Sequence, residues 1–224
     1  MTSLLSVILF GFVLGMRHAT DPDHVIAVAT IGSQQRSIAG GALIGVLWGV
    51  GHTLTLVAVG IAIIAFNVVI SPELGHSLEL VVALMLILLG ILSLRGATRP
   101  VAEGIRPPGP DALHDFSIGR LLRPLMIGIV HGLAGSASIA LLVLTPIRDP
   151  LWAAMYLLVF GAGTIAGMML ITGLMVWPLA HIGHRSATLR RRLTTATGAL
   201  SLAFGVLLAY QIGIVGSVFA GHAW

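Results

Sequence analysis

The sequence predicts an all-α fold: a polytopic membrane helical bundle with six transmembrane helices in a 3+3 inverted repeat. Three observations predict it, namely the composition, the lengths of the apolar runs and a weak similarity between the two halves. Of the 224 residues, 57% are hydrophobic and only 9% are charged. A soluble domain carries roughly 25% charged residues, so most of this surface is expected to contact the lipid bilayer.

Six apolar runs are long enough to cross a membrane, which requires about 20 mostly apolar residues. We predict spans over residues 4–31, 38–70, 77–94, 121–144, 151–179 and 195–218. A polar cluster interrupts the first run, and the second and fifth runs exceed the length of a span, so tilted or kinked helices are expected. Tryptophans are expected to anchor the bundle at the membrane interfaces, and there are four of them: Trp48, Trp152, Trp177 and Trp224.

All 12 basic residues are arginine, and their positions predict the orientation of the chain. Ten lie in or beside the connections after the first, third and fifth runs, whereas the opposite side holds only Arg148. Arginine-rich connections stay in the cytoplasm, so both termini are predicted to be extracytoplasmic in an inner-membrane protein. The net charge of +4 therefore reflects topology and does not indicate a nucleic-acid partner. No cleavable signal is expected, since the first run lacks a basic n-region.

The two halves resemble each other at three places in the same order. Gly-Met-Arg-His at 15–18 parallels Gly-Ile-Val-His at 128–131, Trp-Gly-Val-Gly-His at 48–52 parallels Phe-Gly-Ala-Gly-Thr at 160–164, and Leu-Gly-Ile at 89–91 parallels Phe-Gly-Val at 204–206. A repeat of three spans must be inverted in the membrane, and such repeats with interrupted helices are typical of transporters. We therefore predict a three-helix repeat over 1–96, a cytoplasmic loop over 97–120 and a second three-helix repeat over 121–224.

The most informative segment is Arg17-His18-Ala19-Thr20-Asp21-Pro22-Asp23-His24, which lies inside the first run. Each charged group at membrane depth costs roughly 2.5–3.5 kcal/mol on insertion scales, so this segment needs a compensating partner. Residues three apart are neighbours on a helix, which places His18, Asp21 and His24 on one face. Pro22 disrupts the backbone ladder there and lets Asp23 turn inward.

Two partners for this segment remain open. A bound dication would balance the carboxylates, and imidazole nitrogen with carboxylate oxygen suits nickel, cobalt or zinc. Cysteine is absent, so thiolate ligands are excluded. The alternative is an intramembrane ion pair of Arg17 with Asp21 or Asp23, which explains the carboxylates but not the two histidines.

Further histidines have weaker signals. His52 lies in Gly49-Val50-Gly51-His52-Thr53, where the glycines would let it approach the first run, and it is a candidate ligand. His131, the repeat partner of His18, is either a pathway residue or a structural hydrogen-bond donor. Two other polar clusters are interpreted as solvated positions without a bound ion: His181 with His184, and Asp111 with His114 and Asp115. Ser136 and Ser138 are interpreted as packing residues.

The segment 14–24 resembles the signature of the nickel–cobalt transporter family, Arg-His-Ala-x-Asp-x-Asp-His, and Gly51-His52-Thr53 resembles its second signature, Gly-His-Ser/Thr. In that family the His and Asp residues of the first signature are required for metal recognition, which here implies His18, Asp21, Asp23 and His24. Well-studied uptake members have eight spans and a later signature with Asp and Glu. This chain has six predicted spans and no acid in 131–138, and so resembles a shorter branch related to urease-accessory membrane proteins.

The function expected is a secondary transporter that moves nickel or cobalt across the inner membrane by alternating access. The expected metal site comprises His18, Asp21, Asp23, His24 and His52, with His131 as a pathway candidate. The ion is substrate, no cofactor and no catalysis are expected, and binding would release protons that a gradient could use. Three alternatives stay open: an efflux permease of the same fold, a membrane metalloenzyme, and a membrane subunit that needs a partner. A homo-oligomer is also compatible with the sequence.

Overall fold

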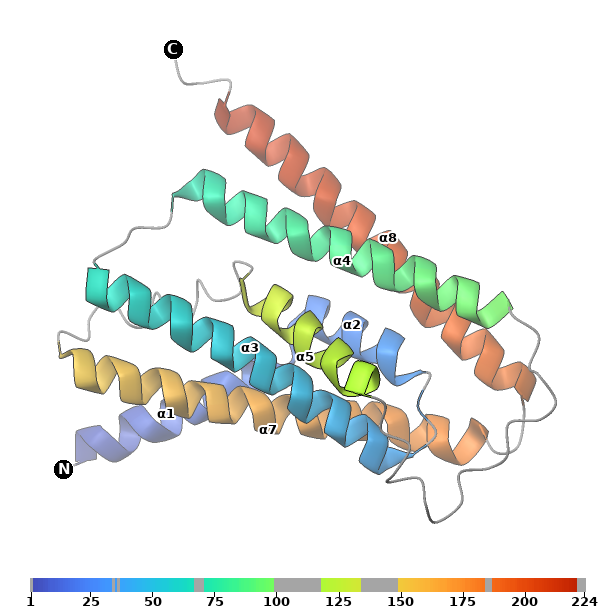
Figure 1. The fold of residues 1–224 in the computed structure, drawn as a ribbon, viewed down its shortest axis with the longest axis horizontal. Helices are drawn as coiled ribbons and strands as arrows, with labels where there is room; N and C mark the ends of the chain where they lie inside the picture. Colours follow the sequence, from blue (N-terminus) through green and yellow to red (C-terminus); the bar gives the residue numbers. More distant parts are fainter. Residues whose placement is uncertain are drawn as a thin grey trace.

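The computed structural model describes residues 2–33, 35, 37–66, 71–98, 118–133, 149–183 and 187–220. Within these ranges the chain is helical apart from short turns and contains no strand, which confirms the predicted all-α class (Figure 1). The helices are α1 (Thr2–His18), α2 (Pro22–Gly32), α3 (Ile38–Phe66), α4 (Pro72–Thr98), α5 (Ile118–Leu133), α7 (Pro150–Gly183) and α8 (Ala187–Ala220).

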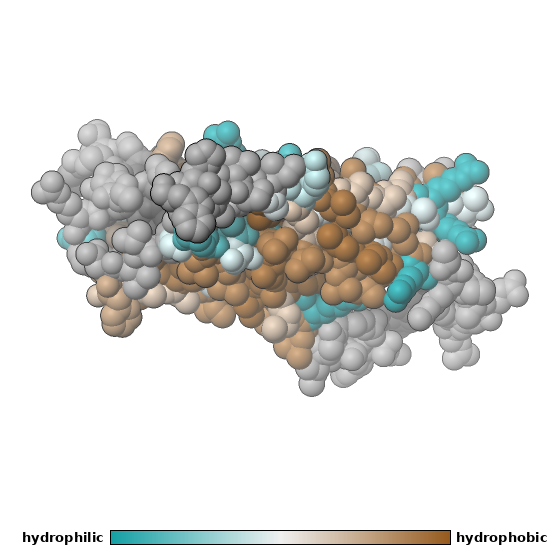
Figure 2. Space-filling model, turned by 90° about the horizontal axis from the view of Figure 1, so that it is seen from above, coloured by the Kyte–Doolittle hydropathy of each residue, from teal (hydrophilic) through white to brown (hydrophobic). Residues whose placement is uncertain are grey.

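Four of these helices are long and apolar enough to cross a membrane. The qualifying stretches are Ile38–Ile63, Glu73–Ala97, Leu151–Pro178 and Thr188–Gly213, in α3, α4, α7 and α8. They correspond to the second, third, fifth and sixth predicted spans. Leucines on them face outward, and Leu174 is 71% exposed. Figure 2 shows hydrophobic residues over the middle of one face and hydrophilic residues towards its ends, as expected of a surface in lipid.

The other two predicted spans look different in the structure. The first, over 4–31, is divided into α1 and α2, and neither part alone reaches the length of a span. The fourth begins with α5, whose apolar part is Leu121–Leu133, and the rest of the predicted run, 134–144, lies outside the described residues. The described residues therefore give four membrane-length helices and three shorter ones.

The polar cluster breaks the first run between His18 and Pro22. The backbone N–H of Thr20 bonds the carbonyl of Arg17 at 2.8 Å, which closes a turn after α1. Asp21 is extended, with φ −60° and ψ 143°, as expected for a residue before proline. Pro22 then begins α2, at a position where its missing N–H leaves no hydrogen bond unmade.

This break was predicted, but its geometry corrects one expectation. The idea that His18, Asp21 and His24 share the face of one continuous helix is wrong, because α1 ends at His18 and α2 is a separate helix. The three side chains still lie near one another, since the turn of three residues folds the start of α2 back towards the end of α1.

Glycines let the helices pack closely. Helix α3 packs against both α7 and α5, α1 packs against α7, and α4 packs against α8 (Figure 1). A methyl group at Gly15 in α1 would overlap the carbonyl oxygen of Phe160 in α7. A methyl group at Gly128 in α5 would overlap the carbonyl oxygen of Trp48 in α3 in the same way. Small residues at such crossings are the usual means of close approach between membrane helices.

The pairing of α4 with α8 follows the same pattern. A methyl group at Gly90 in α4 would lie 2.6 Å from the backbone nitrogen of Leu202 in α8. One at Gly205 in α8 would lie 2.9 Å from the backbone nitrogen of Ile87 in α4. Gly90 and Gly205 are the glycines that the sequence comparison paired, so each contact has a counterpart in the other half of the chain.

Candidate metal centre

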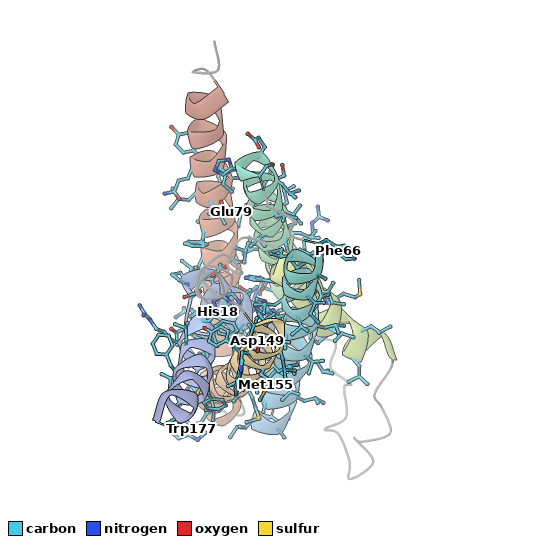
Figure 3. All side chains as sticks on the ribbon, turned by 90° about the vertical axis from the view of Figure 1, so that its left-hand side faces the viewer. His18, Phe66, Glu79, Asp149, Met155 and Trp177 are labelled. Carbon is cyan, nitrogen blue, oxygen red and sulfur yellow. The ribbon has the colours of Figure 1, made fainter. Side chains whose placement is uncertain are left out.

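Four histidines from four helices meet in the interior of the bundle. His18 ends α1, His24 lies in the first turn of α2, His52 lies in the middle of α3, and His131 lies near the end of α5. His18 is 5% exposed and the other three are completely buried. Figure 3, in which His18 is labelled, shows its position among the helices. Four imidazoles buried together are costly unless their nitrogens have partners.

The first group of contacts joins α1 to α3. Nε2 of His18 lies 3.1 Å from Nε2 of His52. Nδ1 of His18 lies 2.8 Å from Oδ2 of Asp21. Because a carboxylate accepts, Nδ1 of His18 carries the proton and donates it, which leaves the lone pair of Nε2 directed at His52. Metal-bound histidines commonly have this arrangement: one ring nitrogen donates to a carboxylate, and the other binds the metal.

The second group of contacts centres on Asp23. Its Oδ1 lies 3.1 Å from Nδ1 of His24, and its Oδ2 lies 2.8 Å from Nε2 of His131. Asp23 therefore accepts from two imidazoles, on α2 and on α5, and fixes the tautomer of each. The carboxylate lies in the first turn of α2, where the helix dipole favours negative charge.

Three ring nitrogens in this cluster are buried without a hydrogen-bond partner among the described residues: Nε2 of His24, Nδ1 of His52 and Nδ1 of His131. Buried polar atoms are normally paired, so each unpaired one needs an explanation. Their lone pairs would have a partner if a cation were bound in the cluster.

The distances suit a metal ion. Ligand atoms of His18, His24 and His52 lie within 4.8 Å of one another, and so do those of Asp23, His24 and His131. Imidazole nitrogens bind zinc-like ions at about 2.0–2.1 Å, so two ligands on one ion lie up to about 4.2 Å apart. Small side-chain rotations would close either group around an ion.

Aromatic side chains form the walls of the cluster. The indole of Trp48 stacks on His24 with a centroid distance of 6.0 Å and an interplanar angle of 7°, and meets His131 edge-on at 5.5 Å. Trp48 is completely buried, so its predicted role as an interface anchor is wrong. Trp152 and Trp177 are 41% and 54% exposed, as an interface position requires. Phe160 of α7 covers His18 at 5.6 Å.

The structure brings together all five residues of the predicted metal site. His18, His24, His52 and Asp23 contribute to one or both groups of ligand atoms. Asp21 lies behind His18, and its side chain is 34% exposed.

His131 is more central than the sequence indicated, because it bonds to Asp23 and lies 4.2 Å from His24 between ring centroids. Its Gly-x-x-His spacing, shared with His18, was the one signal that could have placed it there.

The predicted arginine ion pair receives no support from the described contacts. The side chain of Arg17 is exposed, and the ion pairs of Asp21 and Asp23 are with histidines. The side chains of the other polar positions singled out in the sequence lie outside the described residues: Asp111, His114, Asp115, Ser136, Ser138, His181 and His184.

The chain is similar over nearly its whole length to a urease accessory protein. No protein-family model matches the chain, and no solved structure matches it. The urease accessory protein UreH of Bacillus sp. (strain TB-90) is 36% identical over 219 residues, which cover 96% of this chain and 96% of that protein. Identity at this level over nearly the whole of both chains agrees with the resemblance to urease-accessory membrane proteins seen in the sequence. The chain belongs to the family of the urease accessory protein UreH.

Proposed function

We propose that the protein is a secondary transporter that moves nickel or cobalt ions across the inner membrane through the buried His/Asp cluster. The observation that carries this proposal is the gathering of four imidazoles and a shared carboxylate inside a bundle of membrane-length apolar helices. The relative is named a urease accessory protein, and the first motif resembles that of nickel–cobalt transporters. Both favour nickel or cobalt as the substrate.

The chemistry of the donors supports a borderline transition metal. Imidazoles with carboxylates suit nickel, cobalt, zinc or copper, whereas magnesium and calcium prefer oxygen ligands alone. His18, His24 and His52 would bind the ion through nitrogen, and Asp21 and Asp23 would orient the rings and balance its two positive charges. An ion bound only by neutral groups at this depth would be costly.

The architecture that we propose is six spans in a 3+3 inverted repeat with both termini extracytoplasmic. The contact of Gly15 with Phe160 corresponds to that of Gly128 with Trp48 once the halves are exchanged, which supports a two-fold relation between them. In such transporters the site lies near the midplane, at interrupted helices where the repeats meet. The break between α1 and α2 beside His18 is such an interruption.

Alternating access in this architecture would expose the cluster to one side of the membrane at a time. Asp21 is the most exposed member, which supports access of the ion from its side. Imidazole must be neutral to bind metal, so protons and the ion compete for the cluster, and a proton gradient could drive transport. Uptake and efflux would use the same site and differ in this coupling.

A flux assay tests the proposal. Purified protein is reconstituted into proteoliposomes, and the entry of nickel, cobalt, zinc and manganese is followed with and without a pH gradient. We expect saturable entry of nickel or cobalt that His52→Ala abolishes, and little entry of manganese. Liposomes that admit no metal beyond the protein-free background, with folded protein present, would contradict the proposal.

A further inference from the structure

We propose that the cluster holds two overlapping stations for the transported ion, and that His24 belongs to both. The inference rests on the proposed function. The first station consists of His18, His24 and His52, and the second of Asp23, His24 and His131. The first joins α1, α2 and α3, whereas the second joins α2 to α5, the first helix of the other half of the chain.

Only one of the two ring nitrogens of His24 has a hydrogen-bond partner among the described residues. Nδ1 lies 3.1 Å from Asp23 and belongs to the second station. Nε2, on the opposite edge of the ring, is completely buried and has no hydrogen-bond partner in the described part of the chain. His18 and His52 both meet the ring of His24 nearly edge-on, at interplanar angles of 69° and 72°. An imidazole with a ligand nitrogen on each side can pass an ion from one group to the other.

The stations differ in charge. The first offers three imidazoles, with the carboxylate of Asp21 behind His18. The second offers the carboxylate of Asp23 itself, between His24 and His131. The two stations share His24 as a ligand, and two dications held by one imidazole would repel each other strongly. One ion therefore occupies one station at a time.

Transfer between the stations requires a rearrangement of protons that the structure accommodates. Without metal, Nδ1 of His24 and Nε2 of His131 donate protons to Asp23. An ion in the second station displaces both protons. Each ring stays neutral if its proton is taken up by the opposite nitrogen, which is Nε2 of His24 and Nδ1 of His131. Both of these nitrogens are buried and have no hydrogen-bond partner among the described residues, so each can accept a proton.

Substitution of one histidine from each station separates this arrangement from its rivals. In His52→Gln only the second station is complete, and in His131→Gln only the first. Glutamine keeps the size and a hydrogen-bond donor. His76→Gln is the matched control, because His76 lies in the first turns of α4, outside both groups. For each full-length protein, nickel binding, nickel flux and the ligands around bound nickel by X-ray absorption are measured.

With two stations, nickel in His131→Gln has three imidazole ligands, and nickel in His52→Gln has two imidazoles and a carboxylate. The nickel affinity of both variants stays within about tenfold of that of the unmodified protein, which is the lower end of the effect of disturbing a metal site. The nickel flux of both falls by more than about tenfold. The control transports like the unmodified protein. Three imidazoles in both variants would show a single four-histidine site and overturn the proposal. Unchanged flux in His131→Gln would assign His131 to packing and overturn it too.

These outcomes are distinct from failure of the proposed function, in which the unmodified protein itself neither binds nor transports nickel. Size-exclusion chromatography and thermal unfolding establish that each variant is folded. If His131→Gln does not fold, His131→Asn replaces it, and the same ligand count decides between two stations and one.

Discussion

Asp23→Asn tests whether the carboxylate shared by two histidines supports metal binding. In the structure Asp23 accepts one hydrogen bond from His24 at 3.1 Å and one from His131 at 2.8 Å. Asparagine keeps one acceptor oxygen, but its amide nitrogen would face the second imidazole N–H, donor against donor. The substitution also removes one of the negative charges that would balance a dication.

The expected loss follows from these contacts. Removal of one carboxylate behind a metal-bound histidine lowers affinity by about 10–100-fold. In the two-station arrangement the first station survives this substitution, and Asp23 orients only one of its histidines, His24, so we expect the lower end, about tenfold, which corresponds to about 1.4 kcal/mol of binding free energy. Isothermal titration of nickel into detergent-purified protein measures it.

Asp149→Asn is the matched control for this substitution. Asp149 is exposed, and its Oδ1 accepts a hydrogen bond at 2.9 Å from the backbone nitrogen of Leu151 at the start of α7. Asparagine caps a helix equally well, so the control should fold and bind nickel normally. If Asp23→Asn binds nickel within about threefold of the unmodified protein, the reasoning is refuted. Loss of a carboxylate that supports a metal site should weaken binding by more than that factor.

Three further outcomes follow from the structure. Gly128→Ala should lower the thermal unfolding midpoint, by the equivalent of about 1–3 kcal/mol, because the added methyl overlaps Trp48. The control Gly75→Ala should not lower it, because a methyl group at Gly75 meets open space. Equal midpoints for the two variants would count against the packing of α5 on α3. Nickel affinity should fall once the pH is low enough for the buried imidazoles to take up protons, because protons compete with the ion for the ring nitrogens; an affinity that stays constant down to the pH at which the protein unfolds would count against histidine ligands. A reporter fused after Trp224 should be active only outside the cytoplasm, and a cytoplasmic signal would contradict the arginine bias and the inverted repeat.

The features that the sequence predicted are those that depend on local chemistry. The lengths of apolar runs gave α3, α4, α7 and α8, because lipid-facing helices need little beyond apolar residues of sufficient number. Pro22 gave the break before α2, because proline and the residue before it restrict the backbone directly. The sequence comparison paired Gly15 with Gly128, and the structure places both at helix crossings, where nothing larger fits between the backbones.

What the sequence could not give are the contacts between distant residues. Asp23 and His131 are 108 positions apart, and only the packing of α5 beside α2 and α3 brings them to 2.8 Å. Trp48 resembles an interface anchor because tryptophan is common there, yet its position on α3 directs it at His24 and His131. The single-helix-face argument failed for a related reason: the turn at 19–21, and not helical periodicity, decides where His18 and His24 meet.

The most direct test of the central claim is the amount of nickel bound by purified protein, with and without His24. Its ring touches the other three histidines, at centroid distances of 4.7, 5.2 and 4.2 Å from His18, His52 and His131, and it belongs to both groups of ligand atoms. Equilibrium dialysis should find about one nickel ion per chain in the unmodified protein, since the ligands close around one ion at a time. His24→Ala should bind essentially none while it remains monodisperse and folded. Equal nickel in the two proteins, or none in either, would contradict a transition-metal site at this cluster.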